Sequence, residues 1–422
     1  MSDELVEDLR RHAGDAPTEP GPSGEVRAGA AVRRARAWLS RLVEPCTLDV
    51  WRYVADVGPV DAVCALREGR APTRVTALAG ARVADDQSLA DLRRAERCGA
   101  RLVVPEDDEW PALSLHCLEL AVLREPVAPL PQRDRTLQLV PPLALWVRGR
   151  PRLDHLVQRS VALVGSRAST GYGEHVATDL GYGLGERGWT TVSGGAFGID
   201  AASHRGALAA GVPTVVVLAC GVDRVYPVAH SALFARVLQD GLLVSEWPPG
   251  CAPLRHRFLV RNRLIAGLTQ GTVVIEAAAR SGAQATANRA ADLGRQVMAV
   301  PGPVTSAMSV GCHELLRDAT KRVALVATAA QVVETVGAIG SDLAAPPERP
   351  QTPRDDLSDI ARRVLDACPV RTGVPPERLA AVAGCDVLDV LRVLPALELA
   401  ELVEWTGSGW RVTHAATGGA AR

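Results

Sequence analysis

The segment VALVG at residues 161–165 opens a series of six short apolar runs that decides the fold. The runs are rich in β-branched residues and nearly free of polar ones, and helix-length amphipathic stretches separate most of them. They are VALVG (161–165), TTVSG (190–194), TVVVLA (214–219), LLVSE (242–246), TVVIE (272–276) and VMAVP (297–301). Strands that helices cover on both faces have this composition. The pattern therefore predicts an α/β fold built on a doubly wound parallel sheet.

Shifts in composition divide the rest of the 422-residue chain. The first residues lack apolar periodicity, as a disordered tail does. Helical spacing occurs in two modules, one before and one after the strands. A proline-rich linker separates the core from the second of these modules. The last module ends in the hairpin signal EWTGSGWRVT (404–413), which after three helical patterns predicts a winged helix. We expect a disordered tail (1–28), a helical module (29–100), a core that begins with a proline-punctuated connector (101–338), a linker (339–356) and a winged-helix module (357–415).

The formal charges of the chain nearly cancel, with 47 basic and 48 acidic residues. No global field therefore attracts nucleic acid, and any such binding must come from a local patch. Lys321 is the single lysine of the sequence. Because Walker A phosphate binding and Schiff-base chemistry each need a lysine in a specific loop or pocket, and Lys321 fits neither, the sequence excludes both classes.

The nine cysteines are scattered without a C-x-x-C pair, and no histidine cluster has zinc spacing. We therefore expect no disulfide framework, no metal site and no cofactor. No apolar stretch is long enough to span a membrane, and the first residues are polar where a signal peptide would be apolar. These features predict a cytoplasmic protein.

Small residues follow the predicted strands at the sheet edge where α/β proteins bind ligands. Glycines there let a phosphate approach the backbone, and serine hydroxyls can donate to it. Together these loops predict a phosphate-binding groove, although each glycine alone can simply make a tight turn. The GYGLG segment (181–185) resembles a dinucleotide fingerprint, but it lies inside a predicted helix and we reject it. The candidate groove residues are Gly165, Ser166, Arg167, Ser193, Gly194, Gly195 and Ser281.

The strongest nucleic-acid signal is RHRFLVRNR at residues 255–263, which holds four arginines, one histidine and one phenylalanine. No Asp or Glu occurs between Glu246 and Glu276, so the segment is locally cationic. Basic groups along a phosphate backbone, interleaved with an aromatic ring for base stacking, are what single strands require. We expect DNA contacts from Arg255, Phe258, Arg261, Asn262 and Arg263.

Two alternative interpretations of this segment stay open. It can be a solvated helix start whose Phe258 packs on the sheet. Arg261 and Arg263 can instead be structural, pairing with Glu246 or Glu276, while Asn262 caps a turn.

Catalytic arrangements are scarce in this sequence. Asp200 and His204 lie four residues apart at a predicted helix start, where a carboxylate suits the helix dipole, so we favour a structural role over a catalytic dyad. No nucleophile elbow, H-E-x-x-H motif or Cys-His pattern occurs. We therefore expect no catalytic residue and a protein that is not an enzyme.

Seven motifs in order between residues 165 and 302 resemble the DNA-processing protein A family, also called Smf. They are GSR (165–167), SGGAFGID (193–200), CGVDRVYP (220–227), SEWPPG (245–250), FLVRNRLIAGL (258–268), VVIEAAARSGAQATA (273–287) and VMAVPG (297–302). The resemblance implies an extended Rossmann-like core that binds and protects single-stranded DNA. It also implies a SAM-like helical module, a homodimer, and loading of a RecA-type recombinase onto incoming strands in natural transformation or related recombination.

By the same resemblance, Arg167 and the Gly194-Gly195 loop would hold phosphates and Phe258 would contact a base. Arg255 stands where the family often has lysine, and residues 261–263 match its R-N-R signature. The chain departs from the family at His313, where we expect asparagine, and at residues 319–320, where Ala-Thr replaces Gly-Ala.

The main competing function is a nucleotide-processing enzyme of a related Rossmann type, such as a phosphoribohydrolase with Glu276 as its acid/base. Those enzymes usually carry P-G-G-x-G-T-x-x-E, which TVVIEAAARSGAQATA (272–287) lacks. For the C-terminal module, five acidic residues against one arginine between Asp386 and Glu404 would repel phosphate. This balance favours protein interaction or regulation there, with a purely structural module as the alternative.

Overall fold

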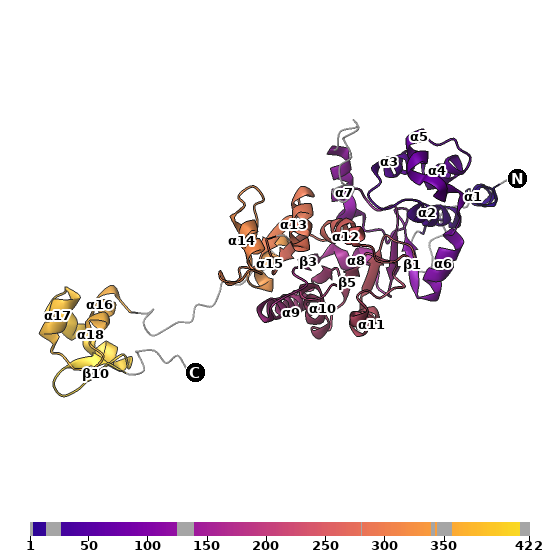
Figure 1. Cartoon of the computed structure of the whole chain (residues 1–422). Coiled ribbons are helices and arrows are strands. Elements are labelled where there is room, and N and C mark those ends of the chain that lie inside the picture. Colours follow the sequence, from indigo (N-terminus) through magenta and orange to yellow (C-terminus); the bar gives the residue numbers. More distant parts are fainter. Residues whose placement is uncertain are drawn as a thin grey trace. The chain divides into compact units, whose positions relative to one another are not determined.

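The computed structural model describes residues 3–13, 27–124, 139–279, 281–338, 342–343 and 357–413. The chain divides into two compact units, Met1–Ala344 and Ala345–Arg422, and each is described by itself (Figure 1). Among the helices of the described residues, none combines the length and the apolar character needed to cross a membrane.

A nine-stranded sheet forms the centre of the larger unit and confirms the predicted α/β fold. The strand order is β1-β2-β6-β5-β4-β3-β7-β8-β9. Strands β3 to β9 pair in parallel, whereas β1 with β2 and β2 with β6 pair antiparallel. Their bounds are β1 Ala100–Val103, β2 Leu145–Arg148, β3 Ser160–Val164, β4 Thr190–Ser193, β5 Thr214–Val217, β6 Leu242–Ser245, β7 Gly271–Val274, β8 Gln296–Ala299 and β9 Ala324–Leu325.

The six predicted strands are present as β3 to β8. The connector at the start of the core also supplies strands β1 and β2 to the sheet, which the sequence pattern did not predict. Leu102 and Val103 of β1 are nearly inaccessible, and Leu145, Trp146 and Val147 of β2 are fully buried. These two strands extend the sheet past β6 with both of their faces buried. Their apolar runs are only four residues long and are separated by prolines, so the sequence pattern does not reveal that they are strands.

Helices cover both faces of the sheet (Figure 1). The alternation of buried side chains along β3 shows which helices lie on each face. Val161 and Leu163 pack with α9, α10 and α15, whereas Ala162 and Val164 point to the other face and pack with α7, α8, α12, α13 and α14. The helix bounds are α7 Ala112–Arg124, α8 Leu153–Gln158, α9 Gly171–Glu186, α10 Ile199–Ala209, α11 Ser231–Asp240, α12 Arg255–Leu268, α13 Gly282–Asp292, α14 Val310–Arg317 and α15 Ala329–Val336.

The direction of the strand order reverses between β3 and β7. Strands β3 to β6 advance toward one edge, and α12 then carries the chain back so that β7 pairs with the other side of β3. Loops after neighbouring strands diverge at such a switch point and leave a crevice at the carboxyl ends of the strands. The fold thus places a ligand site between β3, α12 and α13.

The helical module comprises α1 Glu4–His12, α2 Ala30–Leu42, α3 Leu48–Val57, α4 Pro59–Arg67, α5 Thr73–Ala79 and α6 Ser88–Arg97. Helix α1 corrects the prediction of a disordered tail over residues 1–28. Its Leu5, Val6 and Leu9 lie on one face and are buried in the core of the module, and Asp3 caps its first turn. The glycines and prolines that suggested disorder follow this helix, and residues 14–26 lie outside the described residues.

The smaller unit contains α16 Asp359–Ala367, α17 Pro376–Ala383, α18 Val387–Leu399 and a hairpin of β10 Val403–Trp405 with β11 Trp410–Val412. The three helices and the hairpin follow in the predicted order, and the winged-helix assignment stays a prediction. On α18, Val390, Leu394 and Leu397 are buried, whereas Leu388, Leu391 and Leu399 are exposed. The predicted linker falls largely on residues 339–341 and 344–356, outside the described residues.

Glycines let α9 and α10 cross closely. A Cβ atom at Gly181 would overlap the carbonyl oxygen of Ser203, and one at Gly206 would overlap that of Thr178. This contact explains the GYGLG segment, whose Gly181 lies in the interior of α9 and packs against a helix. The rejection of GYGLG as a nucleotide fingerprint agrees with this position.

We expect Gly181→Ala to lower the free energy of unfolding by about 1–3 kcal/mol, since the added methyl group forces the two helices apart. Gly171→Ala is the matched control, because it lies in the first turn of the same helix with nothing within 4 Å of its Cβ position. That variant should be neutral or slightly stabilising. Denaturant titration of both variants measures the difference, and equal stabilities would contradict the packing argument.

Candidate nucleic-acid interface

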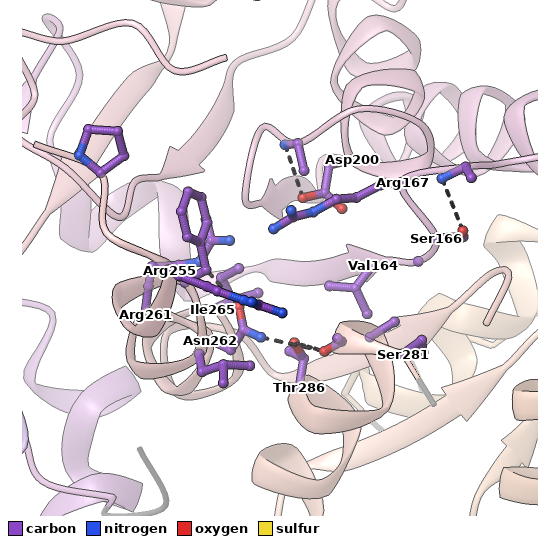
Figure 2. A pocket seen from close by; sticks show the side chains of 18 of the residues that line it. Val164, Ser166, Arg167, Asp200, Arg255, Arg261, Asn262, Ile265, Ser281 and Thr286 are labelled. Carbon is purple, nitrogen blue, oxygen red and sulfur yellow. Dashed lines mark hydrogen bonds between the residues drawn. The ribbon is translucent and has the colours of Figure 1, made fainter. Parts of the chain in front are cut away.

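A groove of about 810 Å³ opens at the switch point between β3 and β7. Its walls are the loop after β3, the start of α10, the segment around Tyr226, the first half of α12 and the start of α13. Figure 2 shows Arg167 reaching into it from one side and Arg255 and Arg261 lying on the other.

The loop after β3 holds Arg167 at the mouth of the groove. Gly165 leaves no room for a Cβ atom because the side chain of Ile199 fills that space. The backbone N–H of Ser166 donates to the carbonyl of Glu276 at 2.8 Å, which ties the loop to the end of β7. Arg167 itself is exposed, with its guanidinium carbon 5.2 Å from the ring centre of Phe258.

Helical spacing divides the RHRFLVRNR segment between two faces of α12. Arg255, Phe258 and Asn262 are three and four residues apart, so they share the face that lines the groove, together with Arg261. Arg257 and Arg263 do not line it. The helix thus presents Arg255 and Arg261 to the groove, and their contact with DNA stays a prediction.

Arg263 belongs to the fold and is withdrawn from the predicted DNA contacts. Its side chain is 0% exposed and forms a two-pronged ion pair with Glu246, with both N–O distances 2.6 Å. Its Nε donates to the carbonyl of Val140 at 2.8 Å. Arg257 is similarly engaged by Glu44 of the helical module. The open alternative of an Arg263–Glu246 pair is the one that the structure contains.

Arg261 is a buried cation that faces the groove; it makes no direct ion-pair contact with a carboxylate of the described residues, and the nearby charge of Asp200 favours its charged form. It is 4% exposed, donates to the carbonyl oxygens of Gly194 (3.0 Å) and Val217, and forms no ion pair within the described part of the chain. Burial lowers the pKa of Arg261 to about 10, so it stays charged at neutral pH. A buried cation without a direct ion pair is costly, and an anion in the groove would reduce this cost.

The loop after β4 supports Arg261 from behind. Ser193, Gly194 and Gly195 are buried and lie off the groove surface, contrary to their predicted direct contact with phosphate. A Cβ atom at Gly194 would overlap the guanidinium of Arg261, and Gly195 has a left-handed φ of 67°. The Ser193 hydroxyl donates to the carbonyl of Leu163 at 2.6 Å. These residues create the space that Arg261 occupies.

Asp200 fixes the backbone of the loop after β4 by accepting hydrogen bonds from it. Its Oδ2 accepts from the backbone N–H groups of Gly194 and Ala196, each at 3.2 Å, and burial raises its pKa. Asp200 lies in the first turn of α10, which agrees with the predicted structural role. His204 is fully buried, its Nδ1 lies 2.8 Å from the Thr214 hydroxyl, and burial lowers its pKa to about 3. The two side chains form no catalytic dyad.

The start of α13 offers donors to the groove. Ser281 caps this helix by accepting from the N–H of Gln284 at 3.4 Å, and Asn262 donates to the carbonyl of Gly282 at 3.5 Å (Figure 2). The first N–H groups of a helix have no partner within it and carry partial positive charge. With Arg167, Arg255 and Arg261, this helix start makes the groove suited to anions.

Glu276, the acid/base of the competing enzyme hypothesis, is held in a capping role. Both carboxylate oxygens accept from Thr170, one from its N–H at 2.9 Å and one from its hydroxyl at 2.5 Å. Glu276 is 1% exposed and does not line the groove. Within the described residues, no group of three metal-ligating side chains comes together.

Sequence reasoning missed Tyr226 and did not assign Asp200 to the groove. Tyr226 follows β5 in the CGVDRVYP motif, so its place after a strand end was a usable signal. His313, the departure from the family pattern, lies near the carbonyl of Gly302 at 3.0 Å and not on the groove.

Fold and site together define a Rossmann-like α/β protein with an arginine-lined groove at its switch point. The family model described as DNA recombination-mediator protein A matches residues 102–337. The chain belongs to this family, which confirms the resemblance found in the sequence.

Individual relatives agree with this assignment. A protein of Mycobacterium tuberculosis named putative DNA processing protein DprA is 45% identical over 388 residues, which are 92% of this chain and 96% of that protein. The DNA processing protein DprA of Streptococcus pneumoniae is 42% identical over 182 residues, 43% of this chain and 64% of that protein. The X-ray structure of DNA processing protein A from Streptococcus pneumoniae superposes on this chain with a TM-score of 0.56 and 29% sequence identity. The match covers 72% of this chain and 96% of the chain in that structure.

We expect Glu246→Gln to lower the free energy of unfolding by about 3–5 kcal/mol, because it leaves the buried Arg263 without its counter-charge. The control is Asp240→Asn, which removes the exposed pair with Arg236 and should cost less than about 1 kcal/mol. Denaturant unfolding of both variants measures the contrast. If both variants lose less than about 1 kcal/mol of unfolding free energy, the ion pair with Glu246 does not stabilise the buried Arg263.

Proposed function

We propose that this chain acts on DNA in recombination and that its groove holds a single strand. The observation that carries the proposal is the group of three arginines in the groove: the buried Arg261, which makes no direct ion-pair contact among the described residues, beside the exposed Arg167 and Arg255. Phosphates would bind these guanidinium groups and the first N–H groups of α13. Phe258 supplies an aromatic surface in the same groove, which an unpaired base can reach and a stacked base pair cannot.

The larger biological role follows from the family resemblance. In this proposal the chain protects incoming single strands and loads a RecA-type recombinase onto them, in natural transformation or related recombination, as a cytoplasmic homodimer. The relatives named above are called DNA processing proteins, which supports the DNA part of this role.

Binding without catalysis agrees better with the site than nucleotide hydrolysis does. Glu276 is buried, accepts two hydrogen bonds from Thr170 and does not line the groove, so it lacks access to a substrate there. Asp200, the carboxylate that does line the groove, is occupied by two backbone N–H groups. We therefore propose that the chain is not an enzyme.

We expect Arg167→Ala to weaken binding of a labelled single strand about 10- to 100-fold, since a charge-assisted contact contributes about 1.5–3 kcal/mol. The slope of log K against log salt should become shallower by about 0.7 for each phosphate that the variant no longer neutralises. Arg187→Ala is the matched control, because Arg187 is exposed at the far end of α9, away from the groove. Fluorescence anisotropy at several salt concentrations measures both effects, and equal affinities of the two variants would refute the site.

Incubation with nucleoside monophosphates tests the enzyme alternative. We expect no released base by chromatography, because the buried Glu276 cannot donate or accept a proton at a substrate. Turnover by the wild-type chain that Glu276→Gln abolishes, while the variant stays folded by circular dichroism, would establish the enzyme instead.

A further inference from the structure

We propose that Glu44 of the helical module is a positioning residue for the groove. Through Arg257 it holds the first turn of α12 in the orientation that directs Arg255 and Phe258 into the groove. Glu44 itself does not line the groove, so it acts on a bound strand only through α12. The inference rests on the proposed function and gives the helical module a part in it.

The first turn of α12 carries charge of the wrong sign for its place in the helix. It begins with Arg-His-Arg-Phe (255–258) and contains no acidic residue. A helix N-terminus carries partial positive charge, so cations there destabilise the first turn. Leu254 occupies the N-cap position, where its apolar side chain cannot accept a hydrogen bond from the helix. This turn is therefore prone to fray unless another part of the chain holds it.

Glu44, which follows α2, supplies the missing negative charge. Its Oε1 accepts from Nη2 of Arg257 at 2.5 Å, and its Oε2 accepts from Nε of the same side chain at 3.2 Å. The second oxygen also lies 3.8 Å from Nε2 of His256. Among the ion pairs of the described residues, those of this turn all involve Glu44. Because Arg257 is only 8% exposed, water screens the pair less than it screens a surface pair.

The helical module also holds the loop that leads into α12. Nε1 of Trp247 donates to Oε2 of Glu44 at 3.0 Å. Arg41 and Arg94, both in the helical module, donate to the carbonyl of Pro249 at 3.1 and 3.5 Å. The loop after β6 and the first turn of α12 are thus fixed together by one part of the chain.

The helix carries this constraint to the groove. Arg255 and Phe258 line the groove, whereas Arg257 in the same turn contacts the helical module. A frayed turn has to be ordered when a strand binds, and ordering its side chains costs binding free energy. Glu44 lowers this cost because it orders the turn beforehand. The helical module thereby contributes to strand affinity without touching the strand.

The test measures binding of a labelled oligothymidylate by fluorescence anisotropy. Glu44→Gln should weaken binding about 3- to 15-fold, the size expected when one or two side chains must be ordered on binding. By charge alone, removing an acid near an anionic strand strengthens binding, so the sign of the change separates positioning from charge. Arg257→Gln should also weaken binding. Adding Glu44→Gln to it should cost nothing further, because the contact is already broken.

Glu106→Gln is the matched control. Glu106 pairs with Arg36 of α2 at 2.6 Å, so this variant loses the same charge and weakens another contact of the helical module, one that does not involve α12. It should bind the strand at least as tightly as the wild type. Hydrogen exchange of residues 255–262 adds a local measurement: it should be faster in Glu44→Gln and unchanged in Glu106→Gln.

Each outcome decides the inference. If Glu44→Gln is folded by circular dichroism and binds as tightly as the wild type, Glu44 positions nothing. Equal losses in Glu44→Gln and Glu106→Gln, or a double variant whose loss is the product of the single losses, also overturn it. Should Glu44→Gln fail to fold, Glu44→Asp takes its place, since it keeps the charge, shortens the reach to Arg257 and should weaken binding in the same direction. If the wild-type chain binds no strand, the proposed function fails and this inference with it.

Discussion

The buried ion pair between Arg263 and Glu246 is the constraint on which the groove depends. It joins the middle of α12 to the loop after β6, and α12 is the segment that carries the chain back across the sheet to β7. A charged pair in the interior is stable only with matched geometry, so it admits one rotation of the helix. That rotation directs Arg255, Phe258 and Arg261 into the groove. The same residues in another rotation would face the sheet.

Charge is partitioned unevenly in a chain whose total is close to zero. In the helical module and at the sheet edge, arginines are neutralised locally, as in Arg33 with Asp107, Arg41 with Asp91 and Arg101 with Glu109. In the described part of the groove, none of the arginines forms an ion pair with a carboxylate. The one carboxylate that lines the described groove, Asp200, accepts from two backbone N–H groups, so three arginines outnumber it there, and net charge gives no sign of this local excess.

The sequence predicted the six parallel strands because runs buried on both faces have a distinctive composition, and it predicted the groove because strand ends gather at one edge. It left open whether Arg261 and Arg263 contact DNA or stabilise the fold, since charge alone does not show which face of a helix a residue occupies until a partner such as Glu246 is placed. The roles of Ser193, Gly194 and Gly195 were similarly hidden: a buried loop that makes room for Arg261 has the same glycines as a loop that touches phosphate. Tyr226 was overlooked because an aromatic residue in a loop has no periodic neighbours.

The groove cations are all guanidinium groups, and this has a consequence for control of the protein. The single lysine, Lys321, pairs with Asp318 just before β9, at the amino edge of the sheet and off the groove. Lysine acetylation, a common way to erase positive charge, therefore has no target in the groove. Guanidinium groups also keep their charge across the physiological pH range. If the groove holds a strand as proposed, neither lysine acetylation nor a change of pH within the physiological range would remove its positive charge.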